Sequence, residues 1–423
     1  MRSVLLVSVD SEPVTGGWPG ALTGLRVLEL GTELTHYCGK MFAELGADVV
    51  LVEPPEGSPL RDQPPFVDDE PGPENSLQFF YRNTSKRGIV VDLAARDSGE
   101  TIRRLAAGAD LILDGLPPGR LEEIGAGPAS LIEQNPELVV TSISPFGQTG
   151  PYAHYAHSDL VCMALGGLLW MGGYTDGPPV RAFGDQAYMA GNLFGAVASM
   201  VALTHAEIRG QGQHVDVSVQ EAVVMGLENA AQYYDLEKHV RRRYGGEQRQ
   251  AGFGVFPCAD GHVFLLAAGL GGDRYWGKLV DWMLEEGIAG ADRLLEDRWT
   301  QREYMYTDEA KNEFWKVFTS FSLDHRKEDL YHESQKRGVP LGPVNRPSDV
   351  LESAQLRHRG YFEEMQAFGR SFRIPGAPYR LSATPWRMTG PAPRLGEHTD
   401  EVLVDFGFTG PEIERLRETG AVR

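Results

Sequence analysis

Leu25-Arg26-Val27-Leu28-Glu29-Leu30 and Asp48-Val49-Val50-Leu51-Val52-Glu53 are the two stretches of sequence that decide the fold. Each is a short apolar run typical of a strand, and residues 34–45 between them have the apolar spacing of a helix. The pattern returns with strands at 87–93, 111–113 and 138–143 and a helix at 98–107. Strands that alternate with helices predict a parallel sheet covered on both faces, so we expect an α/β fold.

The central part of the chain carries the strongest helix signal. Residues 186–209 are apolar and rich in small side chains, and the run ends at Gly210, which predicts a long helix. A strand is predicted at 212–219, followed by a second long helix that continues through Tyr234.

A change of texture marks a second domain. Residues from about 245 to 340 contain more Trp, Tyr and charge, with a Gly-rich segment at 269–272. We therefore predict a smaller domain that is cut off near residues 225 and 340. The tail from Gly342 is expected to run through loops and strands to a short helix near 412–419.

Composition restricts the partners and the compartment. The 423 residues include 42% hydrophobic and 23% charged side chains, with a net charge of -19 and a pI near 5.0, which argues against nucleic acid or an anionic membrane as partner. Cys38, Cys162 and Cys258 are far apart and form no zinc-binding spacing, so we expect neither a disulfide framework nor a metal. The apolar start, Met1 to Val9, is too short for a signal peptide, and we expect a soluble cytoplasmic protein.

The first strand–helix–strand unit raises the question of a dinucleotide-binding dehydrogenase. Glu53 ends the second strand where an acid that binds a ribose would stand. However, the sequence after Leu30 lacks the G-x-G-x-x-G pattern. The bulky side chains of Glu33 and Tyr37 would block the close approach of a pyrophosphate, so the sequence disfavours this class of enzyme.

Gly184-Asp185 is the most informative pair for chemistry. It lies between the Gly/Pro turn at 175–179 and the apolar run at 193–203, which places a carboxylate at the start of the predicted helix. Asp is a favoured N-cap residue, and the local pattern alone favours that structural role. A carboxylate at this position is also stabilised as an anion and can attack an acyl group. Both roles stay open at this point.

Eight short segments, in order along nearly the whole chain, carry a family resemblance. They are residues 24–30, 45–50, 83–87 (Asn-Thr-Ser-Lys-Arg), 118–121 (Pro-Gly-Arg-Leu), 147–152 (Gly-Gln-Thr-Gly-Pro-Tyr), 210–213, 339–344 and 395–400 (Leu-Gly-Glu-His-Thr-Asp). Together they make the chain resemble the class III CoA-transferases, the CaiB/BaiF family. The resemblance implies a Rossmann-like large domain, a smaller α+β domain and two subunits threaded through each other as an interlocked, ring-like homodimer. It gives residues 1–224 and 342–423 to the large domain and 225–341 to the small domain with its linkers.

The resemblance also implies a covalent mechanism on Asp185. Its carboxylate would attack an acyl-CoA thioester to give an anhydride, and the CoA thiolate would return to form an aspartyl-CoA thioester. An incoming carboxylic acid would then leave as the new CoA ester. The loop Gly252-Phe253-Gly254 is the candidate for the backbone donors that bind the oxyanions. Glu33 stands where relatives place a polar active-site side chain, although a surface residue at a helix start is the simpler interpretation.

Other activities in the family remain alternatives. The 2-methylacyl-CoA racemases place a histidine directly before the aspartate that matches Asp159, whereas Ser158 stands there in this chain. The nearest histidine, His157, is one residue earlier and is expected to point elsewhere, which favours a transferase over a racemase. A lyase of the same family, or a non-catalytic protein that binds CoA esters, is the remaining alternative.

The expected CoA site uses basic residues of the matched segments. Lys86, Arg87 and Arg120, with Asn83, are the candidates for binding CoA, which is a substrate here, and we expect no tightly bound cofactor. Two departures from the family pattern put contacts to CoA in doubt. They are Thr35-His36-Tyr37 in place of Ala-Gly-Pro and Asp114-Gly115-Leu116 in place of Glu-Asn-Phe.

Two further features carry no assignment from the sequence. The basic run Arg241-Arg242-Arg243 is either an anion site or a solvated linker face. Tyr188, Trp170 and Met171 are candidates for shaping the acyl pocket, but the acyl donor and the acceptor acid stay open.

Overall fold

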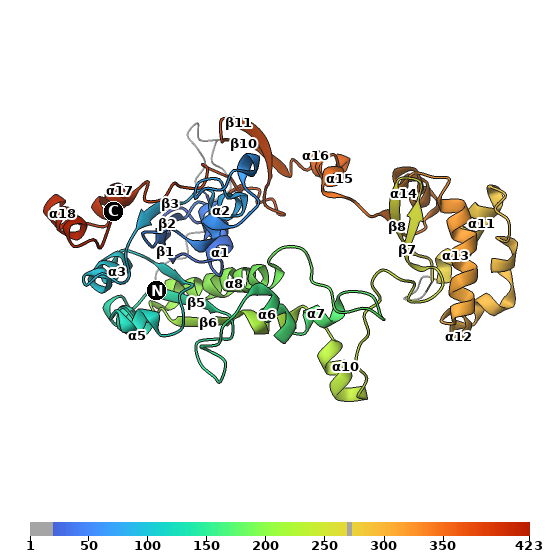
Figure 1. Cartoon of the computed structure of the whole chain (residues 1–423), viewed down its shortest axis with the longest axis horizontal. Helices are drawn as coiled ribbons and strands as arrows, with labels where there is room; N and C mark the ends of the chain where they lie inside the picture. Colours follow the sequence, from blue (N-terminus) through green and yellow to red (C-terminus); the bar gives the residue numbers. More distant parts are fainter. Residues whose placement is uncertain (1–19, 269–272) are drawn as a thin grey trace. The chain divides into compact units, whose positions relative to one another are not determined.

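The computed structural model describes residues 20–268 and 273–423 (Figure 1). The apolar start of the chain and the Gly-rich segment at 269–272 lie outside the described residues. The chain forms two compact units. The larger contains the described residues through Leu168, 183–228 and 360–423, and the smaller contains 169–182 and 229–359. The domain limits predicted from the sequence, at 224/225 and 341/342, remain predictions.

A parallel sheet of six strands forms the centre of the larger unit, in the order β3-β2-β1-β4-β5-β6 (Figure 1). The strands are β1 (Arg26–Leu30), β2 (Asp48–Glu53), β3 (Arg87–Val90), β4 (Leu111–Asp114), β5 (Val139–Ser144) and β6 (His214–Ser218). The predicted α/β fold with a parallel central sheet is confirmed. Because the strand order reverses its direction between β1 and β4, the carboxyl ends of these two strands border the crevice where such folds bind ligands.

One face of the sheet carries the main hydrophobic core. Leu28, Val50, Ile112 and Val140 point to this face and are fully buried. The helices that contribute to this core are α3 (Ser98–Ala107), α4 (Arg120–Glu123), α5 (Pro128–Gln134), α17 (Thr399–Asp405) and α18 (Gly410–Glu418).

The opposite face is covered by α1 (His36–Ala43) and α8 (Gln186–Arg209), which lie beside each other (Figure 1). The small residues of α8 allow this close packing: a Cβ added at Gly195 would lie 2.4 Å from Ile143 Cδ1. Ser199 of α8 also shares a 2.7 Å hydrogen bond with Thr141 of β5. The sheet therefore fixes the position of α8, and Asp185 stands at the start of this helix.

The prediction of one long helix that continues through Tyr234 is wrong. The chain forms two short helices instead, α9 (Val219–Met225) and α10 (Ala230–Glu237). Glu228 between them has φ 53°, a left-handed conformation that a right-handed helix cannot contain. Apolar periodicity did not reveal this break because Leu227 and Ala230 continue the pattern across it.

The smaller unit has its own sheet and core. Strands β7 (Phe253–Cys258), β8 (Gly261–Leu266) and β9 (Leu341–Pro343) pair antiparallel. Its core joins Phe256, Trp282, Phe314, Phe318 and Phe321. The helices of this unit include α10, α11 (Asp273–Glu285), α12 (Arg302–Met305), α13 (Asp308–Ser322), α14 (Lys327–Arg337), α15 (Pro347–Leu351) and α16 (Ala354–His358).

The remaining elements connect or border these parts. They are α2 (Leu77–Asn83), α6 (Asp159–Leu165), α7 (Leu168–Met171), the hairpin β10 (Phe362–Ala367) and β11 (Arg370–Pro375), and 3₁₀ turns at Pro59–Asp62, Val67–Asp69, Asp292–Leu295 and Asp297–Thr300. Of these, α2 and α6 matter most, because both reach the start of α8.

Candidate active site

Asp185 occupies the N-cap position of α8, but its side chain accepts no hydrogen bond from the first turn of this helix among the described residues. Gly184 before it has φ +78°, a conformation that an L side chain rarely adopts, and this turn directs the chain into the helix. The structural role that the local pattern favoured, a capping side chain, is therefore wrong for Asp185. Its carboxylate is left for another contact.

Asp159 caps α8 in place of Asp185. Asp159 Oδ1 accepts the Tyr188 N–H at 2.9 Å, and the Ala187 N–H also bonds to this carboxylate. Asp159 is the first residue of α6, whose own start is capped by the Ser158 hydroxyl, which accepts the Val161 N–H. Burial, together with the Asp185 charge, raises the pKa of Asp159 above its ordinary value, although the bonds from the helix partly oppose this rise.

The Asp185 carboxylate pairs with Arg82 of α2. Arg82 Nη2 donates to Asp185 Oδ2 at 2.5 Å. The Asp185 side chain is 30% exposed, while that of Arg82 is 8% exposed. Sequence reasoning missed Arg82, which is separated from Asp185 by 103 positions. The available signal was a charged residue that directly follows the aromatic run Phe79-Phe80-Tyr81.

Glu33 and His157 both lie near the first turns of α8. Asn192 of α8 donates to the Glu33 carbonyl oxygen at 3.2 Å, and the pKa of Tyr188 is raised by burial and then by the Glu33 charge. His157 Nδ1 lies 3.0 Å from the Tyr188 hydroxyl. The helical rotation used to place His157 does not apply, because α6 begins only at Asp159 and His157 lies in the loop before it. That His157 points away from the position of the racemase histidine remains a prediction.

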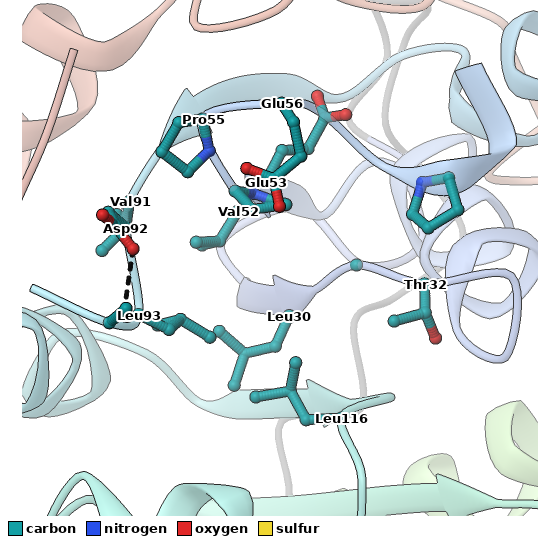
Figure 2. Close-up of a pocket in the computed structure, with 14 residues that line it drawn as sticks. Leu30, Thr32, Val52, Glu53, Pro55, Glu56, Val91, Asp92, Leu93 and Leu116 are labelled. Carbon is teal, nitrogen blue, oxygen red and sulfur yellow. Dashed lines mark hydrogen bonds between the residues drawn. The ribbon is translucent and has the colours of Figure 1, made fainter. Parts of the chain in front are cut away.

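A pocket of about 270 Å³ opens at the carboxyl ends of β1, β2 and β3, with Leu116 after β4 at its edge (Figure 2). Thr32, Glu53 and Asp92 are among its lining residues. Glu53 does not present a free carboxylate to a ribose, because Arg61 binds it with two hydrogen bonds of 2.7 and 2.8 Å. This pocket lies where open parallel sheets bind ligands.

Lys86 and Asn83 belong to a buried network behind this edge. Lys86 Nζ donates to Glu29 Oε2 at 2.6 Å, to the His36 carbonyl oxygen at 2.8 Å and to Asn83 Oδ1 at 2.8 Å. Burial raises the pKa of Glu29, but the Lys86 charge and the bonds to His36 and Lys86 outweigh it and lower this pKa to about 2. All three ammonium protons are used inside the protein, and contact of Lys86 with a CoA phosphate remains a prediction.

Arg87 and Arg120 lie closer to solvent. Arg87 pairs with Asp48, Glu401 and Asp405. Arg120 pairs with Glu123 and donates to the Leu93 carbonyl oxygen at 2.9 Å, and Leu93 lines the pocket of Figure 2. Of the four candidates for binding CoA, Arg120 is therefore the one with a direct bond to a pocket residue.

The two segments that depart from the family pattern, residues 35–37 and 114–116, lie next to each other. Thr32 Oγ1 donates to the Gly115 carbonyl oxygen at 3.1 Å, and a Cβ added at Gly115 would lie 2.4 Å from that hydroxyl and 3.0 Å from Thr35 Cγ2. The hydroxyls near 32–35 thus fill the space that a side chain at 115 would need. Asp114 beside it is buried and bonded to Ser142, and burial raises its pKa to about 6.

Gly252-Phe253-Gly254 lies in the smaller unit, at the start of β7. A Cβ at Gly252 would lie 2.8 Å from Trp276 Cζ3, so packing within this unit already requires the glycine. The Gly252 and Phe253 N–H groups donate to the Gln248 side chain and the Gln250 carbonyl oxygen. Binding of an oxyanion by this loop remains a prediction.

The basic run also has internal partners in the smaller unit. Arg243 donates to the carbonyl oxygens of Tyr174 and Gly177, and its guanidinium lies 4.9 Å from the centre of the Trp170 ring. Arg241 lies over the Tyr233 ring at 3.9 Å. Arg243 therefore holds the 170–177 segment in place. Within the described ranges, no group of His, Cys, Asp and Glu is arranged to hold a metal ion.

Comparison with known proteins decides the family. Residues 22–399 match the family model for CoA-transferase family III. This chain belongs to CoA-transferase family III. The resemblance inferred from the sequence is confirmed.

Named relatives of this family III CoA-transferase include a CoA-transferase subunit and a CoA-transferase. The chain is 41% identical over 400 residues to the succinyl-CoA:(R)-benzylsuccinate CoA-transferase subunit BbsE of Thauera aromatica, covering 94% of this chain and 97% of that protein. It is 32% identical to the succinate–glutarate CoA-transferase of Agrobacterium fabrum, covering 91% and 95% of the two chains.

Solved structures agree with the fold. A CaiB/BaiF family protein from Brucella suis has a TM-score of 0.80 and 27% identity, covering 92% of this chain and 100% of its own. A protein from Mycobacterium tuberculosis, at 22% identity and a TM-score of 0.76, shows the same fold and covers 92% and 100% of the two chains. The transferase prediction is confirmed at the level of the enzyme class.

Proposed function

We propose that this enzyme transfers CoA from a dicarboxylic acyl-CoA such as succinyl-CoA to a carboxylic acid, with Asp185 as the covalent nucleophile. One observation carries the proposal. Because Asp159 accepts the N–H bonds at the start of α8, the Asp185 carboxylate makes no capping bond there among the described residues and stays partly exposed. The names of the relatives from Thauera aromatica and Agrobacterium fabrum support a succinyl or related dicarboxylic donor.

The proposed chemistry splits the transfer into steps on one carboxylate. An Asp185 oxygen attacks the thioester carbonyl, the C–S bond breaks, and CoA thiolate leaves an aspartyl anhydride. The thiolate then attacks the Asp185 carbonyl carbon, which releases the donor acid and leaves an aspartyl-CoA thioester. The acceptor carboxylate reverses these two steps and departs as the new CoA ester. Covalent steps of this kind replace one difficult transfer by easier ones.

The pocket of Figure 2 is the proposed site for the nucleotide end of CoA. Its position at the carboxyl ends of parallel strands supports this assignment. Arg120, which bonds to the Leu93 carbonyl oxygen at the pocket, is the proposed partner for a phosphate, with Arg87, Lys86 and Asn83 as the other predicted contacts. Backbone donors of the Gly252-Phe253-Gly254 loop are proposed to bind the oxyanions.

The proposed assembly is the interlocked homodimer, in the cytoplasm. Its support is the outer face of α8, where Leu193, Val197, Val201 and Ile208 are exposed. Among the described residues, α8 is the one helix long and apolar enough to cross a membrane, by length and composition only, yet its other face packs on the sheet. Light scattering of the purified chain measures its mass. A dimer supports the proposal, and a monomer that pairs only with a different chain contradicts it.

The function is tested by mixing the enzyme with succinyl-CoA and a panel of carboxylic acids and following new CoA esters by mass spectrometry. Asp185→Asn is the matched variant, and we expect it to be inactive. If no CoA moves but the α-proton of a branched acyl-CoA exchanges with deuterated solvent, acid–base chemistry involving His157 replaces the transferase proposal.

A further inference from the structure

Arg82 has bonding capacity that the covalent steps leave unused. Its Nη2 atom donates to Asp185 Oδ2 and, at 3.3 Å, to Gln78 Oε1. Its Nη1 atom is buried and has no hydrogen-bond partner among residues 20–268 and 273–423. A buried donor without an acceptor is costly, and an arginine side chain that is 8% exposed is rarely left in this state. The free donor therefore points to a ligand with an acceptor oxygen.

The proposed covalent steps also remove the charge that Arg82 faces. Asp185 is a carboxylate in the free enzyme but a neutral acyl group in both the anhydride and the aspartyl-CoA thioester. A guanidinium does not lose its proton in proteins. Because a buried cation without a counter-charge is strongly unfavourable, Arg82 needs another anion during the time that Asp185 is acylated.

We propose that the Arg82 guanidinium exchanges partners within each catalytic cycle. It pairs with Asp185 in the free enzyme and with the carboxylate of the incoming acid in the aspartyl-CoA form. This inference rests on the proposed function and assigns Arg82 as a catalytic residue that binds the acceptor. The planar fork of arginine suits a carboxylate, since its two terminal nitrogens can hold one anion with two parallel bonds.

The exchange balances in charge and atoms. An oxygen of the bound acceptor carboxylate attacks the Asp185 carbonyl carbon, the C–S bond breaks, and CoA leaves as a thiolate. The thiolate attacks the acceptor carbonyl of the resulting anhydride, and the C–O bond to Asp185 breaks. The acceptor leaves as a CoA thioester, and the regenerated Asp185 carboxylate returns to Arg82. No proton is gained or lost in these steps.

Asp159 is the competing partner for Arg82. Its Oδ2 atom is buried without a hydrogen-bond partner among the described residues. Burial raises the pKa of this carboxyl group, and the Arg82 charge offsets part of that rise. If Arg82 turned to Asp159 after acylation, the acceptor would not need Arg82. Asp159 Oδ1, however, is held by the N–H groups at the start of α8. The two possibilities differ in their effect on acceptor binding.

The test measures the two half-reactions separately in Arg82→Gln and Arg82→Lys. Loading with succinyl-CoA is followed by the mass of the CoA adduct, and discharge is followed as acceptor acid is added. We expect Arg82→Gln to load, while its KM for the acceptor rises about 10- to 100-fold and its KM for succinyl-CoA changes less than about twofold. Arg82→Lys, which keeps the charge without the fork, should fall between.

The control is Arg417→Gln, which removes an arginine of α18 that pairs with Asp400 and Glu414. This variant should load and discharge as the unchanged enzyme does. The inference is overturned if Arg82→Gln keeps the normal KM for the acceptor, as pairing with Asp159 predicts. It is equally overturned if loading and discharge slow by the same factor, as a residue that only orients Asp185 predicts. Failure of the unchanged enzyme to load would instead contradict the proposed function.

Discussion

Two ion pairs in the larger unit, Arg82–Asp185 and Lys86–Glu29, differ in how completely they are enclosed. The side chains of Lys86 and Glu29 are 0% exposed, and all three Lys86 ammonium protons are bonded. Asp185 is 30% exposed, and the Nη1 atom of Arg82 has no partner among the described residues. The first pair is a completed structural network. The second has a partly exposed carboxylate and an unused donor, which are the properties that the proposed reaction needs.

The contrast shows that a charged residue in a family motif can have all its hydrogen bonds completed inside the protein. Lys86 lies in the matched segment 83–87, yet it stabilises the junction of β1, α1 and α2 from inside. Arg82, just before that segment, faces the proposed nucleophile. The completeness of each side chain's hydrogen bonds separates the two roles better than sequence position does.

Removing the Asp185 carboxylate from the Arg82–Asp185 pair should have the largest effect on activity. Asp185→Asn is expected to lower the transferase rate on the order of 10³-fold or more, because an amide oxygen cannot form the anhydride. Its free energy of unfolding should also fall, by about 1–3 kcal/mol, because the buried Arg82 guanidinium loses its counter-charge, a carboxylate that is 30% exposed. Steady-state kinetics and urea unfolding of the same preparation measure both. A rate within about tenfold of that of the unchanged enzyme would refute the assignment.

Breaking the fully buried Lys86–Glu29 pair should act mainly on stability. Lys86→Met leaves the Glu29 carboxylate buried without its cation, which is expected to cost about 3–5 kcal/mol of unfolding free energy. The double variant Glu29→Gln/Lys86→Met should recover part of this loss, since both charges are then absent. Urea unfolding measures the change. A stable Lys86→Met with a raised KM for the CoA ester would show that Lys86 binds CoA after all.

Asp114 extends the comparison to a buried carboxylate whose hydrogen-bond donors, the Leu116 N–H and the Ser142 hydroxyl, are neutral. Burial raises its pKa from 3.8 to about 6. The folded state therefore binds more protons between these values, and stability from this residue falls as the pH rises through that window. Relative to the unchanged protein, Asp114→Asn should gain about 2–3 kcal/mol in unfolding free energy between pH 4 and pH 7. If the difference in unfolding free energy between the two proteins stays constant over this pH range, the raised pKa of Asp114 is contradicted.

The smallest effect concerns which carboxylate caps α8. Asp159→Ala removes the acceptor of the Tyr188 N–H and should cost about 1–2 kcal/mol of unfolding free energy. Asp159→Ala and the matched variant Asp185→Ala are compared in the Arg82→Gln background, where neither change leaves the guanidinium without a counter-charge. There Asp185→Ala should cost less, because Asp185 makes no capping bond among the described residues. Thermal or urea unfolding of the two variants, side by side, ranks them. The reverse ranking would return the capping role to Asp185.

Local sequence patterns predicted the elements of this fold well where they are regular. The limits of β2 and α3 agree with the predicted ranges, and the helix predicted at 186–209 is α8. The break between α9 and α10 was not predicted, because the left-handed turn at Glu228 has no glycine to mark it. Backbone conformation of this kind depends on tertiary contacts rather than on apolar periodicity.

The candidate site could be predicted only in part, for a related reason. Asp185 stood out because a Gly-Asp pair before an apolar helix is a local signal. Its partner Arg82 and the true cap, Asp159, reach it from α2 and α6 through contacts between distant segments. A hydrogen bond over 103 positions leaves no trace in local spacing. The exclusion of a capping role for the Asp185 side chain therefore needed the structure.

The most direct test of the central claim is the mass of the peptide that contains Asp185 after brief reaction with succinyl-CoA. The account predicts a CoA adduct on Asp185 that disappears when a carboxylic acid acceptor is added and is absent from Asp185→Asn. A transferase that turns over while this peptide stays unmodified, or that carries CoA on another residue, would contradict it.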